Sequence, residues 1–139
     1  AKLILFIAEQ WILVAATLTC VFMLLYHESR RAGKTLSPQQ VANLMNKENA
    51  VLIDLRDSNE FTAGHVIDAI NIPHAKFAAS VSDLEKYRER PIVLTCKMGQ
   101  HSSGAGKTLA SKGFSPIYRM SGGMMDWQGQ QFPVVKGRG

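Results

Sequence analysis

Cysteine is scarce in this chain, whose 139 residues include only Cys20 and Cys96. Cys20 lies inside a long apolar run, whereas Cys96 ends a short strand-like run and is followed by Gly99. Two cysteines in such different surroundings argue against a disulfide framework. We interpret Cys20 as a small apolar packing residue without chemistry. An isolated cysteine is more often inert than nucleophilic, so the neighbours of Cys96 decide its role.

A concentration of charge of one sign is also missing. The chain has 16 lysines and arginines against 11 aspartates and glutamates, a net charge of +5, and the two signs are interspersed. This weak and scattered positive charge predicts no nucleic-acid binding. Internal repeats and low-complexity segments are absent as well. The length suffices for one ordinary domain with an appendage and excludes two full cores.

A long apolar run is the first feature that is present, and it covers residues 3–26 with only Glu9 and Gln10 as interruptions. As a helix it would extend ~36 Å, enough to cross a hydrocarbon core of ~30 Å. We therefore expect residues 1–34 to form a transmembrane anchor with a basic linker. A cleavable signal peptide is the alternative, but only Lys2 precedes the run and no small-x-small cleavage site follows it.

Basic residues are distributed unevenly about this run. Arg30, Arg31 and Lys34 follow it, whereas only Lys2 precedes it. The positive-inside rule therefore predicts a single-pass protein of the inner (cytoplasmic) membrane whose soluble domain faces the cytoplasm. That compartment keeps thiols reduced, as a reactive Cys96 would require.

Strand-like and helix-compatible segments alternate after the linker. The strand-like runs cover residues 50–55, 91–95 and 115–119, and the helix-compatible segments cover residues 59–63, 82–88 and 102–112. Ser37 and Gln40 form a capping box at the start of a further helix. This rhythm predicts an α/β domain over residues 35–139 with a central, mainly parallel sheet. Ligand sites in such domains lie beyond the carboxyl ends of the strands, where Cys96 is found.

The segment around Cys96 suits a thiolate. It joins a strand to a helix, so backbone N–H groups and the helix dipole can face an anion. Gly99 allows the loop to curl, Ser102 or Ser103 can cap the helix, and Lys97 and His101 add positive charge. A plain strand-to-helix turn with a buried cysteine fits the same segment equally well from local chemistry alone.

Three ordered motifs resemble the rhodanese family, and the resemblance covers residues 35–139. Residues 51–73 are similar to its I-D-x-R, E-[FY], G-H-[IV] and A-x-N-[IL]-P series. Residues 96–102, CKMGQHS, are similar to the active loop C-x-x-G-x-R-S, and residues 122–127 resemble a closing G-G-x-x-x-W element. The resemblance implies a rhodanese-like three-layer domain with a central mainly parallel sheet, preceded here by one transmembrane helix.

The resemblance also implies a sulfurtransferase activity in which Cys96 carries sulfur as a persulfide. Sulfur would move from a small-molecule or protein donor, such as thiosulfate or a persulfide, to a thiol or cyanide acceptor. No cofactor and no metal ion is expected. The substrate-binding loop would consist of Lys97, Met98, Gly99, Gln100, His101 and Ser102. Structural roles near the site would fall to Asp54, Arg56, Glu60 and His65, which we expect to tie strand ends to loops.

One departure from the family pattern concerns the donor. His101 stands where the family often has arginine, and histidine lacks the bidentate fork that grips anions. Binding of thiosulfate could therefore be weaker here.

Two other functions fit the sequence less well. Phosphatases and arsenate reductases use a similar cysteine loop, but theirs is usually one residue longer and carries an arginine, which the loop between Cys96 and Ser102 does not. A membrane-tethered scaffold with little turnover is the alternative from a different class. The presence of Cys96 argues against a pure scaffold without excluding it.

Overall fold

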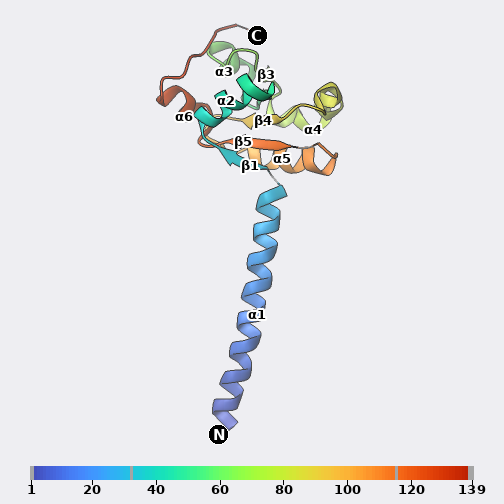
Figure 1. Ribbon diagram of the computed structural model, residues 1–139, viewed down its shortest axis with the longest axis vertical. Helices are drawn as coiled ribbons and strands as arrows, with labels where there is room; N and C mark the ends of the chain where they lie inside the picture. Colours follow the sequence, from blue (N-terminus) through green and yellow to red (C-terminus); the bar gives the residue numbers. More distant parts are fainter. Residues whose placement is uncertain (1, 32, 115, 138–139) are drawn as a thin grey trace. The chain divides into compact units, whose positions relative to one another are not determined.

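The computed structural model describes residues 2–31, 33–114 and 116–137, with side chains given for all of these except residues 28–31 (Figure 1). Ser115, the first residue of the third predicted strand, lies outside the described residues. The chain divides into two compact units, residues 1–30 and residues 31–139.

The first unit is one helix, α1 (Lys2–Arg31). The stretch Lys2–His27 is long and apolar enough to cross a membrane, and an 18-residue segment within it has a mean hydropathy of 1.9. The hydroxyls of Thr17 and Thr19 donate to the carbonyls of Leu13 and Ala15 one turn earlier, at 2.9 and 2.8 Å. These polar groups are therefore satisfied inside the helix and need no water.

The second unit is built on a five-stranded sheet. The strands are β1 (Lys34–Leu36), β2 (Val51–Asp54), β3 (Ile70–Asn71), β4 (Ile92–Thr95) and β5 (Ile117–Met120), in the order β1-β5-β4-β2-β3. Every neighbouring pair is parallel, which confirms the predicted sheet type. The strand β4 lies at the centre of the sheet, and residues 51–54 and 92–95 are buried throughout.

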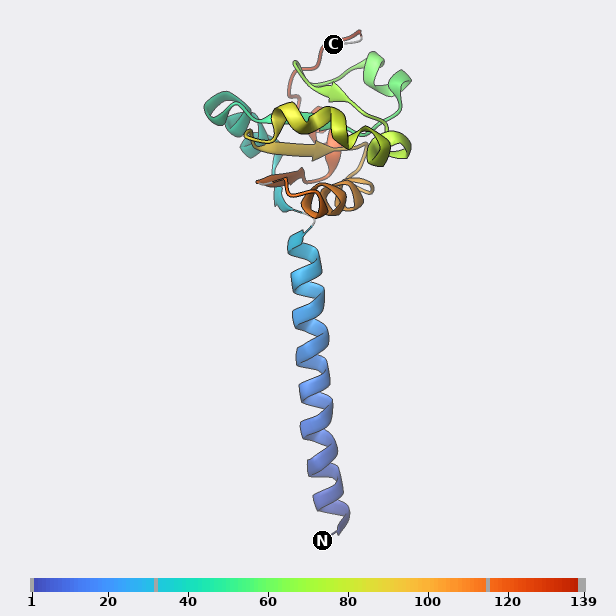
Figure 2. The same cartoon turned by 90° about the vertical axis from the view of Figure 1, so that its right-hand side faces the viewer.

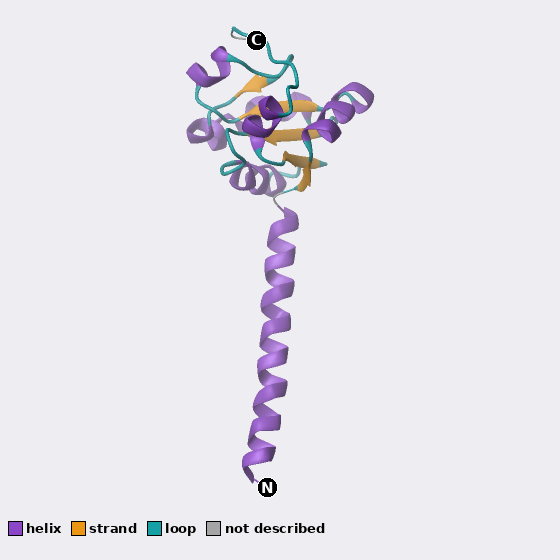
Figure 3. Cartoon of the chain, turned by 90° about the vertical axis from the view of Figure 1, so that its left-hand side faces the viewer, coloured by secondary structure: helices purple, strands orange, loops and turns teal. Residues whose placement is uncertain are grey.

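Helices connect the strands (Figures 2 and 3). They are α2 (Pro38–Glu48), α3 (Ser58–Ala63), η1 (His74–Lys76), α4 (Phe77–Ser80), η2 (Val81–Tyr87), α5 (Ser102–Ser111) and α6 (Gly123–Gly129). The capping box of Ser37 and Gln40 is present at the start of α2. Residues 81–87 form a 3₁₀ helix, because Val81, Leu84 and Tyr87 are three residues apart and a three-residue turn places all of them on one side.

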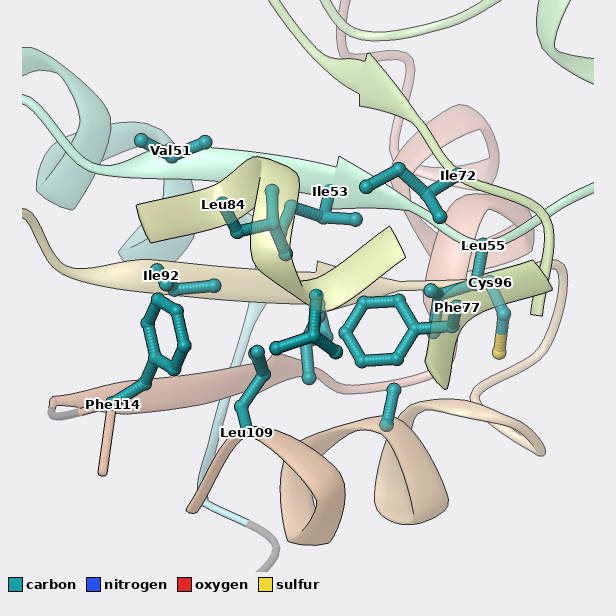
Figure 4. Close-up of a cluster of buried hydrophobic side chains, with 13 residues drawn as sticks. Val51, Ile53, Leu55, Ile72, Phe77, Leu84, Ile92, Cys96, Leu109 and Phe114 are labelled. Atoms are coloured by element: carbon teal, nitrogen blue, oxygen red, sulfur yellow. The ribbon is translucent and has the colours of Figure 1, made fainter. Parts of the chain in front are cut away.

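Alternating side chains on the strands divide the core between the two faces of the sheet. Val51, Ile53 and Leu94 pack on one face with residues of α4, η2 and α5, and Figure 4 shows this cluster with Cys96 at its edge. Leu52 and Val93 pack on the other face with residues of α2, α3 and α6. The predicted three-layer α/β architecture is thus confirmed.

The strand β1 is a difference from the prediction, which treated Gly33 and Lys34 as a linker. Lys34–Leu36 pairs with Tyr118–Met120 of β5, and the Gly33 carbonyl accepts a hydrogen bond of 3.1 Å from Arg119 Nε. Only Leu36 of the three strand residues is buried. A strand this short with one core residue leaves no hydrophobic alternation in the sequence, so it could not be recognised.

Truncation tests the boundary between the two units. A protein that begins at Gly33 should fold as a soluble domain, because β1 and its partner contacts are retained. Removing residues 1–36 should lower the free energy of unfolding by about 2–4 kcal/mol, since the buried Leu36 side chain and the β1 hydrogen bonds are lost. Urea denaturation followed by circular dichroism measures the difference, and equal stability of the two proteins would contradict a structural role for β1.

Candidate active site

Cys96 follows the last residue of the central strand β4, at the carboxyl end of the sheet. The chain leaves β2 for the edge strand β3 and then returns to β4 on the other side of β2. Strands β2 and β4 therefore meet where the direction of winding reverses, which is the usual position of ligand sites in parallel α/β sheets. The predicted placement of Cys96 beyond a buried strand agrees with this arrangement.

Backbone N–H groups converge on the sulfur of Cys96. Gly99 N–H lies 3.0 Å from Sγ and His101 N–H lies 3.4 Å from it. Gly99 has a φ of +94°, a left-handed conformation that favours glycine and lets the loop turn back on itself. Cys96 is only 1% exposed, so these donors act where water competes little with them. Such donors stabilise negative charge on sulfur, as a thiolate or as the outer atom of a persulfide.

The side chain of Gln100 covers the sulfur. Its Oε1 atom accepts a hydrogen bond of 2.9 Å from Met98 N–H and lies 3.5 Å from Sγ of Cys96. The Met98 donor determines the orientation of the amide, since a flipped side chain would set an NH₂ group against an N–H group. With its oxygen toward the sulfur, Gln100 accepts from a protonated thiol and would be repelled by a thiolate. Rotation of Gln100 away from the sulfur would release Met98 N–H.

The helix α6 holds the outer side of the loop. Met124 N–H donates to the Cys96 carbonyl at 2.7 Å, and Met125 N–H donates to the Lys97 carbonyl at 2.9 Å. Gly123 makes this contact possible, because a Cβ atom there would lie 2.2 Å from the Cys96 carbonyl oxygen and its φ is +60°. The resemblance included this Gly-Gly element, but its role in holding the cysteine loop was not predicted. Two successive glycines directly before a helix were the available signal.

The remaining loop residues differ in exposure. Lys97 and Met98 are exposed, whereas Ser102 is buried and its hydroxyl donates to the Gly99 carbonyl at 3.0 Å. The N-cap position of α5 is His101, which makes no side-chain capping bond. The expected cap by Ser102 or Ser103 was therefore wrong, because the Ser102 hydroxyl braces the loop instead.

Asp54 and Arg56 form a buried ion pair at the end of β2. Arg56 Nη2 lies 2.8 Å from Asp54 Oδ2 and donates to the Gly64 carbonyl at 2.7 Å. Asn71, at the end of β3, donates from its side chain to the main-chain carbonyls of both residues. Such a pair can be buried because its charged groups form hydrogen bonds with each other and with the main chain. The network ties the ends of β2 and β3 to the following loop.

The other two residues expected near the site lie outside the cysteine loop. His65 is fully buried, donates from Nδ1 to the Phe61 carbonyl at 2.8 Å and stacks on the Phe61 ring at 3.8 Å. Its Nε2 atom has no partner among the described residues. Glu60 is half-buried in the first turn of α3, where its negative charge interacts favourably with the helix dipole.

His74 is a neighbour of the loop that the sequence did not indicate. Its ring stacks on the His101 ring, with centroids 3.7 Å apart and an angle of 5° between the planes. His74 begins η1, and its main-chain N–H donates to the Leu55 carbonyl at 3.0 Å. Within the part of the chain that the structure describes, no three His, Cys, Asp or Glu side chains are grouped to hold a metal ion.

The fold and the loop together define a parallel α/β domain with a single cysteine held at the carboxyl end of its central strand. Residues 37–130 match the Rhodanese-like domain family, and the chain belongs to this family.

Similar proteins cover most of the chain. A protein named YibN from Escherichia coli K12 is 30% identical over 124 residues, which are 88% of this chain and 87% of that one. The thiosulfate sulfurtransferase GlpE from Pseudoalteromonas translucida is 35% identical over 97 residues, or 70% of this chain and 90% of that one. The crystal structure of a rhodanese-related protein from Thermoplasma volcanium has a TM-score of 0.66 at 24% identity and covers 73% of this chain and 97% of its own.

Substitution of Gly123 tests the contact between α6 and the loop. Gly123→Ala places a methyl group against the Cys96 carbonyl in a left-handed conformation, so we expect a loss of about 2 kcal/mol or more in unfolding free energy. Alkylation of Cys96 should slow as its donors are displaced. The control is Gly129→Ala, where a Cβ atom meets nothing within 4 Å. If the two variants match in stability and alkylation rate, the contact does not support the site.

Substitution of Gln100 tests whether its amide covers the thiol. Gln100→Ala removes the acceptor and should speed alkylation of Cys96 by iodoacetamide about fivefold, the equivalent of one hydrogen bond. Gln100→Glu should slow the reaction at neutral pH, because a carboxylate would oppose the thiolate. Rates that are unchanged in both variants would rule out this role for Gln100.

Proposed function

We propose that the chain is a sulfurtransferase in which Cys96 carries sulfur as a persulfide. The convergence of Gly99 N–H and His101 N–H on Sγ is the observation that supports this proposal most directly. Membership of the rhodanese-like family and the similarity to a thiosulfate sulfurtransferase support it further.

The reaction proceeds in two displacements at sulfur. The Cys96 thiolate attacks the outer sulfur of thiosulfate, the S–S bond to the sulfonate breaks, and sulfite leaves with the bonding electron pair. The loop amides then hold the terminal sulfur of Cys96–S–S⁻, and Met98 N–H joins them once Gln100 has moved. An acceptor thiolate attacks this outer sulfur, takes it as its own persulfide and releases the Cys96 thiolate.

The loop residues affect the possible sulfur donors differently. Lys97 is exposed and can attract anionic donors, while Gly99 and Ser102 keep the loop curled. The His101 ring is occupied by its stack on His74, so the loop offers no bidentate grip for the sulfonate of thiosulfate. We therefore expect an organic persulfide to load Cys96 faster than thiosulfate does.

Intact mass measurement tests the proposed carrier. The full chain with Cys20→Ala, purified in detergent, should gain about 32 Da, one sulfur atom, on treatment with thiosulfate or a thiol persulfide and lose it to cyanide. Cys96→Ser in the same background should gain nothing, because a serine hydroxyl is not ionised at neutral pH. Failure of every donor to load the protein would refute the proposal. Full rescue of a deletion phenotype by Cys96→Ser would favour the scaffold function instead.

We propose further that α1 crosses the inner membrane once and that the rhodanese-like domain faces the cytoplasm. The internally bonded hydroxyls of Thr17 and Thr19 and the apolar length of the helix support the crossing. The basic residues Arg30, Arg31 and Lys34 after the helix support the orientation.

Cysteine labelling tests this topology. A single exposed cysteine, Gly129→Cys, is placed in a chain that carries Cys20→Ala and Cys96→Ser. A membrane-impermeant maleimide should leave it unlabelled in cells whose outer membrane is permeabilised and should label it after the inner membrane is broken. Labelling before the inner membrane is broken would place the domain on the opposite side.

A further inference from the structure

A groove runs between α4 and α5 beside the cysteine loop. Its volume is about 330 Å³. The residues that line it include His74, Phe77, Gln100, His101, Gly104 and Thr108. Gln100 and His101 belong to both the groove and the loop, and both contact Cys96 Sγ through the bonds described above. The groove therefore shares two residues with the loop that holds the sulfur.

We propose that this groove binds the organic part of the sulfur acceptor, a low-molecular-weight thiol that carries a carboxylate. The proposal rests on the proposed sulfurtransferase function and names the class of its second substrate. The volume is at the lower end of the range for small-molecule pockets, about 300–1,000 Å³, which suits a small thiol.

The absence of a side chain at Gly104 indicates that the groove is kept open. A Cβ atom at this position meets nothing within 4 Å, and the residue lies inside the helix α5 without a positive φ. Glycine inside a helix is less stable than alanine, and neither close packing nor backbone conformation among the described residues requires it here. Its lack of a side chain instead leaves the groove unobstructed.

The histidine stack favours an anionic group on the ligand. His74 and His101 lie face to face at 3.7 Å, so two protonated rings would repel each other. A carboxylate beside the pair offsets this repulsion and accepts hydrogen bonds from imidazole N–H groups. Phe77 also lines the groove but is only 3% exposed, so it offers a small apolar surface to the carbon chain of the ligand.

Persulfide discharge measured with different acceptors tests the groove. The full chain with Cys20→Ala is loaded with thiosulfate in detergent, freed of donor, and discharged with glutathione, with cysteamine, which lacks a carboxylate, or with cyanide. Intact mass follows the loss of the outer sulfur. The test variants are Gly104→Leu, which fills the groove, and His74→Gln, which removes one imidazole. The matched control is Gly129→Leu, since Gly129 is also open at its Cβ position.

Gly104→Leu should slow discharge by glutathione about tenfold, a usual effect of a misfit in a small pocket, while loading and discharge by cyanide stay within about twofold. His74→Gln should slow glutathione about fivefold and leave cysteamine nearly unchanged, as expected for one lost polar contact. Gly129→Leu should behave as the parent protein.

Three results would overturn the groove proposal. In the first, glutathione discharges both test variants at rates within about twofold of the parent rate. In the second, Gly104→Leu slows discharge by glutathione and by cyanide equally. In the third, a protein thiol discharges the parent protein but glutathione does not. A parent protein that gains sulfur from neither thiosulfate nor a thiol persulfide is a different result, because it refutes the sulfurtransferase function itself.

Discussion

The hydrogen bonds from the first turn of α6 to the carbonyls of Cys96 and Lys97 are the constraint on which the site depends. A peptide group directs its N–H and C=O in opposite directions, so holding the Cys96 and Lys97 carbonyls toward α6 points the N–H groups of Lys97 and Met98 away from that helix, and Met98 N–H donates to Gln100 Oε1. Gly99 N–H and His101 N–H, further along the same loop, donate to Sγ. The contact requires Gly123, because any Cβ atom at that position would overlap the Cys96 carbonyl. The closing Gly-Gly element and the cysteine loop are therefore one structural unit.

The sheet supplies the rigidity that this unit needs. Strand β4 is central and buried on both faces, so Cys96 follows directly from a fully buried strand. The buried pair of Asp54 and Arg56 holds the neighbouring strand end in place. The same loop contributes Gln100 and His101 to the groove along α5, where the second substrate would approach. In the proposed reaction, reactivity and acceptor choice would thus depend on adjacent residues of a single loop.

Much of the fold could be predicted because buried strands and helix starts leave regular patterns in the sequence. The apolar runs at β2 and β4, the capping box at Ser37 and the position of Cys96 after a strand are of this kind. The short strand β1 has only one buried residue and leaves no pattern. The His74–His101 stack joins residues far apart in the chain, and one sequence contains no signal of such a contact. The bonds from α6 also join distant residues, and only the two successive glycines before that helix indicate them. The orientation of the Gln100 amide likewise depends on the loop geometry.

A crystal structure of the protein after treatment with a sulfur donor tests the central claim most directly. The account predicts a second sulfur bonded to Sγ of Cys96, with its terminal atom accepting hydrogen bonds from loop amides that include Met98 N–H, and with Gln100 turned away. A terminal sulfur that points out of the loop while Gln100 still accepts from Met98 N–H would contradict it.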